Sequence, residues 1–225
     1  MKALAILQNA DFESPGALPG WAEEMGFSVR TYLAYEEGLP ALGSFSHLVV
    51  LGTPHSVHDI GQHSWLKNVQ ELTASAMKAN RAVLGICFGA QLMAQLLGGE
   101  VAVGAEAEIG WHGFTREPWP ASLPRAEGAK LFQWHREFFT VPAGAEALGI
   151  SAAGYASGFR AGRNIAVSGH LEMTEELVEL YIQRCWSEAV RTGPFCQGPE
   201  LMRDQAELFR ATAFAKSIFT SWLGQ

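Results

Sequence analysis

The feature that most constrains the fold is a series of short apolar runs, rich in β-branched residues, that recurs along the chain. Stretches with apolar residues at helical spacing separate several of these runs, as at 16–25 and 64–79. Strands buried on both faces read as continuous apolar runs, so the alternation predicts an α/β fold with a mostly parallel central sheet and helices on both faces. The predicted strands are 3–7, 29–33, 47–51, 82–86 and 164–168.

The remaining segments extend this arrangement around the same core. A Pro-rich, aromatic segment at 117–124 leads to residues 130–142, which we expect to form a small antiparallel excursion over one end of the sheet. Residues 174–190 and 199–223 read as C-terminal helices, the first capped by Thr174. At 225 residues we expect one domain, 1–225, in which 190–225 is a C-terminal helical extension.

Charge and cysteine content exclude several classes of function. A net charge of -7 argues against a surface that binds nucleic acid, because such surfaces cluster Lys and Arg. The three cysteines, at 87, 185 and 196, form neither a CxxC pair nor an even disulfide framework, which favours a reducing cytoplasm. No run of 18 apolar residues occurs, so we expect no membrane partner.

The segment 85–89, Gly-Ile-Cys-Phe-Gly, lies between a predicted strand and a helical stretch that ends at Gly98. Strand, tight turn and helix in this order are typical of a nucleophile elbow, where flanking glycines avoid collisions with neighbouring strands. The start of the helix favours a thiolate at Cys87 through its dipole and free N–H groups. The alternative is a small buried hydrophobe in a Gly-rich turn.

A thiol nucleophile needs a base, and His170 follows the last predicted strand. Glu172 stands two residues further on, so in an extended chain it points the same way and can orient the imidazole. His135 is the rival base, and a surface or helix-capping role near Thr174 is the alternative for His170.

A resemblance becomes specific once these segments are taken together. They resemble the class I glutamine amidotransferases, of the stand-alone kind similar to the amidotransferase domain of GMP synthase. The resemblance covers about residues 1–175, in order along the chain. The segments that carry it are 84–91, 96–99, 108–111, 133–135 and 170–172.

The resemblance implies a flavodoxin-like fold and assigns roles to several residues. Cys87 is the nucleophile, His170 the base and Glu172 the orienting carboxylate. The backbone N–H groups of Phe88 and Thr53 are the expected oxyanion donors. No cofactor is expected. The residues expected around the substrate are Gly52, Gln91, Glu108, Ile109, Gly110, Trp111 and His135.

The sequence departs from the family pattern at three positions. Thr53 replaces the second glycine of a Gly-Gly-Pro segment, and a β-branched residue there resists unusual dihedral angles. Ser168 and Gly169 replace a Gln and an aromatic residue ahead of His170, which raises the question of how that histidine is packed. A loop with three histidines, at 55, 58 and 63, suggests a metal site as an alternative, but we expect no metal and interpret them as rim residues.

These observations favour hydrolysis of the side-chain amide of glutamine, or of another γ-glutamyl amide, through a thioester on Cys87. Ammonia would pass to a separate acceptor enzyme, because the chain has no phosphate loop. The alternatives are a γ-glutamyl peptidase acting on glutathione-type conjugates and a non-catalytic binding subunit. The related chaperones and deglycases with a cysteine elbow carry His after the cysteine, where this chain has Phe88.

Overall fold

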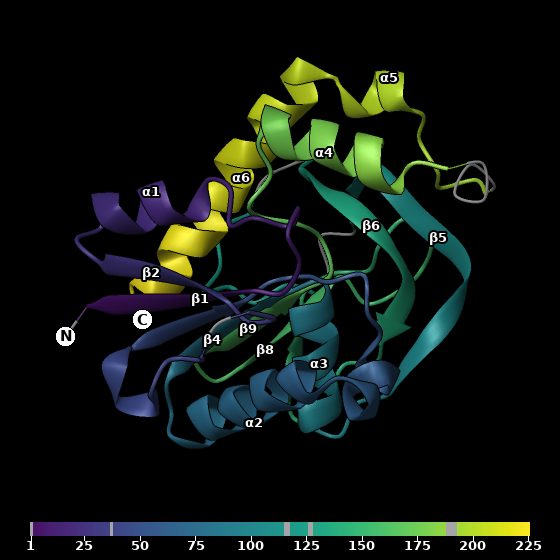
Figure 1. The fold of residues 1–225 in the computed structure, drawn as a ribbon. Helices are drawn as coiled ribbons and strands as arrows, with labels where there is room; N and C mark the ends of the chain where they lie inside the picture. Colours follow the sequence, from purple (N-terminus) through teal and green to yellow (C-terminus); the bar gives the residue numbers. More distant parts are fainter. Residues whose placement is uncertain (1, 37, 115–117, 126–127, 188–192) are drawn as a thin grey trace.

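The computed structural model describes every residue except 1, 37, 115–117, 126–127 and 188–192 (Figure 1). Its centre is a seven-stranded sheet in the order β2-β1-β3-β4-β9-β8-β7. The first five strands in this order pair in parallel, whereas β8 pairs antiparallel with both β9 and β7. The predicted α/β fold with a mostly parallel sheet is therefore confirmed. In sheet order the strands are β2 (Ser28–Leu33), β1 (Ala3–Gln8), β3 (His47–Val50), β4 (Ala82–Ile86), β9 (Asn164–Val167), β8 (Gly158–Ala161) and β7 (Glu146–Ala147).

Helices cover both faces of the sheet, as the continuous apolar strands require. On one face α1 (Leu18–Glu24) and α6 (Gln205–Leu223) pack, and on the other α2 (Ser64–Lys78) and α3 (Phe88–Leu96) (Figure 1). Strand β1 shows the alternation directly, because Leu4 and Ile6 belong to the first core while Leu7 belongs to the second. Among the described residues, no helix has both the length and the hydrophobicity to cross a bilayer.

A two-stranded antiparallel ribbon stands beside the sheet. It consists of β5 (Val101–Gly113) and β6 (Lys130–Phe139), with a register shift between Val103 and Glu108. The predicted excursion is therefore present, although its first strand begins well before residue 130. Helix α4 (Glu175–Cys185) packs on the ribbon, and Thr174 caps it by accepting from Leu177 N at 3.2 Å, as predicted.

The C-terminal part differs from the prediction of one helix over 199–223. Two helices are present, α5 (Pro199–Met202) and α6, because Asp204 takes an extended conformation and caps α6 through the backbone N–H groups of residues 206 and 207. The helix predicted over 174–190 ends at Cys185, and its last predicted residues lie outside the described part. Two short 3-10 helices were also not predicted, η1 (Leu42–Ser44) and η2 (Val57–Gln62).

The described part of the Pro-rich segment, residues 118–124, does not border the cavity described below. Within its described part, Trp119 is buried and stacks on Phe114 at 5.3 Å, next to Phe214 of α6. The backbone N–H of Gly149 donates to Pro118 O at 2.7 Å. This segment therefore closes the core beneath α6 rather than shaping a binding site.

The turn between β4 and α3 has a backbone geometry that glycine makes possible. Cys87 has φ of 53° and ψ of -110°, a conformation that non-glycine residues rarely adopt. A Cβ added at Gly85 would lie 2.5 Å from the carbonyl carbon of Gly89. A Cβ added at Gly89 would overlap the carbonyl oxygen of Val50 in β3. The two glycines therefore let α3 begin directly against the sheet.

This packing predicts a large difference between two glycine-to-alanine changes. Gly89→Ala should lower the free energy of unfolding by about 1–3 kcal/mol, because backbone must move to admit the methyl group. Gly20→Ala is the matched control, since that exposed α1 position has open space around it, and it should be neutral or stabilising by about 0.5–1 kcal/mol. Urea denaturation measures both values. Equal stabilities of the two variants would contradict the assignment.

Candidate active site

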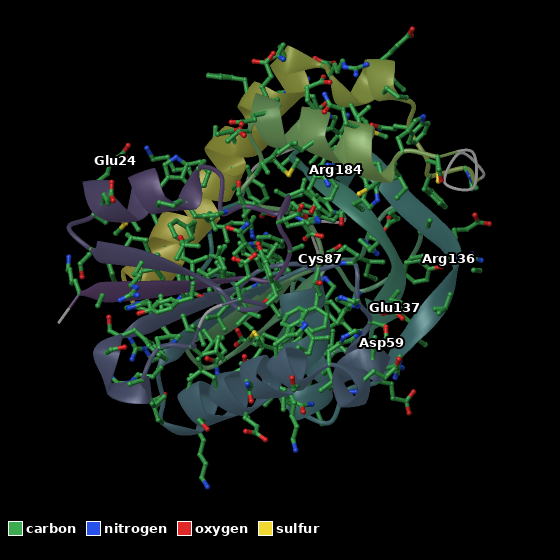
Figure 2. The ribbon with its side chains drawn as sticks, in the orientation of Figure 1. Glu24, Asp59, Cys87, Arg136, Glu137 and Arg184 are labelled. Atoms are coloured by element: carbon green, nitrogen blue, oxygen red, sulfur yellow. The ribbon has the colours of Figure 1, made fainter. Side chains whose placement is uncertain are left out.

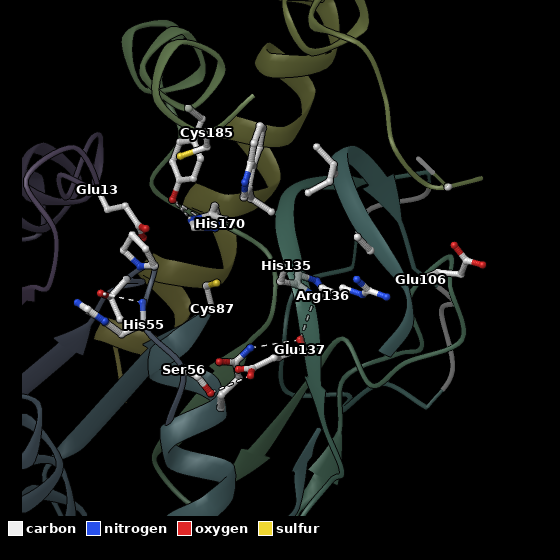
Figure 3. Close-up of a pocket in the computed structure, with 18 of the residues that line it drawn as sticks. Glu13, His55, Ser56, Cys87, Glu106, His135, Arg136, Glu137, His170 and Cys185 are labelled. Atoms are coloured by element: carbon white, nitrogen blue, oxygen red, sulfur yellow. Dashed lines mark hydrogen bonds between the residues drawn. The ribbon is translucent and has the colours of Figure 1, made fainter. Parts of the chain in front are cut away.

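A cavity of about 760 Å³ lies at the carboxyl ends of the parallel strands, where doubly wound folds place their sites (Figure 3). Its walls come from the loops after β1 and β3, the start of α3, the ribbon and helix α4. Cys87 lies among these elements (Figures 2 and 3). Sites of this kind commonly hold a small molecule.

Cys87 forms the junction between β4 and α3 and contributes to the cavity lining. Its backbone N–H donates to Val167 O of β9 at 2.9 Å, which fixes the turn against the neighbouring strand. Helix α3 begins at Phe88, whose side chain is buried in the core. The backbone N–H groups of a first helical turn have no partner within the helix, so the predicted donor at Phe88 belongs to a turn suited to bind an anion.

His170 is held from two sides. Its backbone N–H donates to Phe132 O of β6 at 2.8 Å. Its Nδ1 lies 2.6 Å from Glu172 Oε1, and both side chains are almost completely buried. The Cys87 thiol lies close enough to the imidazole to raise its pKa. The structure therefore brings together the three residues predicted as a triad, in the order thiol, imidazole, carboxylate.

The environment of His170 favours its charged form. Burial lowers the pKa of His170, but the Glu172 carboxylate and the hydrogen bonds to Cys87 and Glu172 outweigh burial and raise it well above its ordinary value. A protonated imidazole beside a thiol stabilises the thiolate by charge attraction. Near neutral pH this arrangement can therefore supply a nucleophile and a proton donor together.

The loop after β3 carries Gly52 and Thr53. Thr53 is buried and lines the cavity, and its hydroxyl lies 3.5 Å from His55 N. A Cβ added at Gly52 would overlap Glu13 Oε2 and lie 3.5 Å from His170 Cε1. A glycine at position 52 therefore makes room for these two side chains, so the one glycine that this loop keeps from the family pattern is sterically required.

His135 and Gln91 form part of the opposite wall. His135 Nδ1 lies 3.1 Å from Glu137 O, and Gln91 Nε2 donates to the same carbonyl at 3.2 Å. Burial lowers the pKa of His135 to about 4, so its ring is neutral near pH 7. Between the two rival histidines, the one that lies beside Cys87 and has a raised pKa is His170.

Glu108 lies behind this wall, outside the cavity lining. It is fully buried, with Oε1 accepting from Ala153 N at 3.0 Å and Oε2 3.5 Å from His135 Nε2. Gln133 Oε1 lies 3.0 Å from the same ring nitrogen. Glu108 and Gln133 therefore orient His135 from behind.

The rest of the segment 108–111 divides between cavity and core. Ile109 lines the cavity. Gly110 has φ of 98° and is covered by the side chain of Gln197, and Trp111 Nε1 donates to Met202 O at 2.8 Å from within the core. Gly110 and Trp111, predicted near the substrate, instead hold the C-terminal segment in place.

The two departures ahead of His170 are accommodated by different segments, Gly169 by β6 and Ser168 by Ser157. A Cβ at Gly169 would lie 2.5 Å from Gln133 Nε2 and 2.7 Å from the Cβ of Leu131, so β6 fills this space. Ser168 Oγ donates to Ser157 O at 3.1 Å and is buried. The bulk that the family pattern has there is supplied here by another strand.

The loop histidines are arranged without a metal-binding geometry. His55 and His63 pack ring against ring at 4.3 Å, and burial followed by the charge of His63 lowers the pKa of His55. Asp59 accepts from Ser56 N at 3.1 Å in the capping box of η2, while the Ser56 hydroxyl donates to Glu137 at 2.8 Å (Figure 3). Over the described ranges, no three His, Cys, Asp or Glu side chains are grouped so that they could hold a metal.

Two residues beside the triad were missed in the sequence. Tyr181 of α4 places its hydroxyl 3.4 Å from His170 Nδ1 and 3.5 Å from Nε2. Glu13, in the loop after β1, is close enough to Tyr181 for the tyrosine to lower its pKa, lines the cavity and is only 6% exposed. A charged residue close behind a buried parallel strand was the available signal for Glu13. Tyr181 had none beyond its place on an apolar helix face.

Glu13 predicts an unusual dependence of stability on pH. Burial raises its pKa from 4.5 to about 7, which the attraction of His170 only partly offsets. Between these two values the folded protein binds more protons than the unfolded chain, so stability falls as pH rises, by up to about 3 kcal/mol. Glu13→Gln removes this cost, and its stability gain over wild type should grow between pH 4 and pH 8 in urea denaturation.

Glu207→Gln is the matched control at another buried carboxyl. Burial raises the pKa of Glu207, but hydrogen bonds from Lys130 and Arg210 outweigh burial and lower it. The ionised carboxylate therefore stabilises the fold above the unfolded pKa, and this stabilisation is lost as pH falls. Glu207→Gln should lose stability at pH 8 and little at low pH. A gain for Glu13→Gln that is the same at both pH values would refute the account.

Comparison with known proteins now places the chain in a family. Residues 23–177 match the family Glutamine amidotransferase class-I. The glutamine amidotransferase-like protein YfeJ of Salmonella typhimurium is 31% identical over 220 residues, covering 89% of this chain and 86% of the relative.

Solved structures agree with this assignment. A glutamine amidotransferase from Methylobacillus flagellatus superposes with a TM-score of 0.88 and 26% identity, covering 100% of this chain and 95% of that one. A glutamine amidotransferase from Thermotoga maritima has a TM-score of 0.81 and 23% identity, covering 98% of this chain and 96% of that one, a likeness in fold alone. The resemblance seen in the sequence is confirmed, and the chain belongs to the class I glutamine amidotransferase family.

Proposed function

We propose that the chain hydrolyses the side-chain amide of glutamine, or of another γ-glutamyl compound, with Cys87, His170 and Glu172 as its catalytic triad. The observation that carries the proposal is the buried pair in which Glu172 binds the imidazole at 2.6 Å, beside the Cys87 thiol, which raises the pKa of that imidazole. The same three groups in this order activate nucleophiles on unrelated folds. Family membership supports the reaction class.

The proposed reaction has two halves. The thiolate of Cys87 adds to the amide carbon, and the oxyanion receives hydrogen bonds from the backbone N–H groups of Phe88 and Thr53. The charged His170 gives its proton to the leaving nitrogen, the C–N bond breaks, and a γ-glutamyl thioester remains on the sulfur. Water then gives a proton to His170 and attacks the thioester, which releases glutamate and restores the thiolate and imidazolium.

The size of the cavity favours a second candidate, a γ-glutamyl peptidase with the same mechanism. At about 760 Å³ the cavity lies in the upper part of the range for drug-sized ligands, more than a single amino acid requires. The added room is bounded by Phe12, Ile109 and Trp134, apolar side chains that suit a larger leaving group. The Pro-rich segment 118–124 takes no part in it.

We also propose that residues 1–225 form one domain. Residues between 12 and 194 line the same cavity, and the C-terminal α6 contributes Phe214 and Phe219 to the core against the sheet. The free thiols of all three cysteines suit a reducing cytoplasm. Where glutamine is the substrate, a separate enzyme is the proposed acceptor of ammonia.

Parallel assays with glutamine and a γ-glutamyl dipeptide test the proposal. Wild type should release glutamate from at least one of them, and Cys87→Ala, His170→Asn and Glu172→Gln should each lower kcat at least about 1,000-fold. Cys196→Ala, a thiol outside the cavity lining, is the matched control and should keep full activity. A higher kcat/KM for the dipeptide selects the peptidase.

Two results would contradict the proposal. The first is full activity of folded Cys87→Ala, since no other group in the proposed mechanism carries the acyl chain. The second is absence of hydrolysis of both substrates by wild type, which would favour the non-catalytic binding subunit. Circular dichroism of each variant establishes that the fold is retained.

A further inference from the structure

His170 faces a second buried carboxyl besides Glu172. Glu13 comes from the loop after β1, on the opposite side of Cys87 from His135 in the close-up view (Figure 3). Its Oε2 and His170 Cε1 both lie over the α-carbon of Gly52, where no side chain separates them. The carboxyl group therefore lies beside the edge of the imidazole ring that carries Cε1.

Tyr181 connects this carboxyl with the ring. Its hydroxyl lies within 3.5 Å of both ring nitrogens of His170, and it is close enough to Glu13 for that carboxylate to raise the pKa of the tyrosine. The tyrosine ring meets the imidazole edge to face, with centroids 5.2 Å apart. Burial and the charges of Glu13 and Glu172 raise the pKa of Tyr181 well above its ordinary value, so the hydroxyl keeps its proton and donates it.

The position of Glu13 is costly for the fold. Its Oε2 is buried and, among the described residues, accepts no hydrogen bond. A buried carboxylate oxygen without a donor is destabilising unless a positive charge lies nearby. The imidazolium of His170 supplies such a charge and lowers the pKa of Glu13. An unpaired acidic group in a cavity is also typical of a functional position.

We propose that Glu13 is a positioning residue that stabilises the imidazolium form of His170 from the Cε1 edge of the ring. The inference rests on the proposed role of His170 as base and proton donor. Glu172 orients the ring through Nδ1, whereas Glu13 adds negative charge at a different edge. The two carboxyls together maintain the proton that the leaving nitrogen must receive.

The titration of His170 depends on all the titratable groups that face His170 and Glu13. His170 is faced by Cys87 from α3, Glu172 from its own segment, Tyr181 from α4, His135 from β6 and Glu13. Glu13 is also faced by Cys185 of α4, whose pKa burial and the Glu13 charge raise to about 11. His135 and Cys185 are therefore neutral near pH 7, and the groups that remain to act on the charge of His170 are Glu172, Glu13 and Cys87.

The direction of the expected change in the His170 pKa follows from the attraction between Glu13 and the imidazolium. An ionised Glu13 favours the imidazolium, so Glu13→Gln should lower the pKa of His170, while Glu172 keeps it above that of an isolated histidine. Tyr181→Phe should act in the same direction, because Tyr181 lowers the pKa of Glu13 and its loss raises the fraction of Glu13 that is protonated. The double variant should therefore shift His170 no further than either single variant.

Nuclear magnetic resonance on the full chain with 13C-labelled histidine measures the pKa of His170 directly. The Cε1–H signal of His170, assigned by its absence in His170→Asn, is followed against pH. In Glu13→Gln its midpoint should fall by about one pH unit, and Glu13→Asp should restore part of the shift. Glu207→Gln is the control carboxyl, bound to Lys130 away from the cavity, and should leave the midpoint unchanged.

Repeating the titration in a Cys87→Ala background removes the contribution of the thiolate, and the shift should persist there. An unchanged midpoint in folded Glu13→Gln would overturn the inference, as would equal shifts in Glu13→Gln and Glu207→Gln. Because the readout needs no substrate, a protein that fails to hydrolyse γ-glutamyl amides yet shows the shift would refute the proposed function and leave this inference standing.

Discussion

The close packing of α3 against the sheet is the constraint on which the rest of the structure depends. Gly85 packs on Gly89, Gly89 packs on the Val50 carbonyl, and Cys87 between them takes a positive φ that few side chains tolerate. This strain directs the sulfur into the cavity at the start of a helix, where free N–H groups favour negative charge. The same turn therefore determines both the position of the Cys87 sulfur and the packing of α3 on the sheet.

The burial of carboxyl groups beside His170 is a second constraint on the structure. Two carboxyls lie beside His170, yet only Glu172 has a short bond to the ring. The fold stabilises Glu207 with two cations, whereas Glu13 has a tyrosine and one shared imidazolium. A chain optimised for stability alone would not keep Glu13 in this setting, and this contrast is the reason to assign it a role in the site.

Much of this was predictable from the sequence, and the failures have physical causes. Continuous apolar runs located all five parallel strands to within one residue at each end, and the glycines at 85 and 89 identified the elbow. The break at Asp204 was missed because apolar spacing continues across it. Glu13 and Tyr181 reach His170 from segments distant in the sequence, so no local pattern predicts that they lie together. The orientation of residues 108–111 depends on contacts with Gln197 and Met202, which are equally distant in the sequence.

The central claim, a reactive thiol at Cys87 shaped to receive a γ-glutamyl group, is tested most directly by a γ-glutamyl chloroketone. The thiolate displaces chloride and forms a stable thioether, which peptide mass spectrometry locates. We predict one equivalent of label on Cys87, blocked by excess γ-glutamyl substrate. The raised pKa values of Cys185 and Cys196 predict that both stay unlabelled at pH 7. Label on Cys185, or none on a folded protein, would contradict the account.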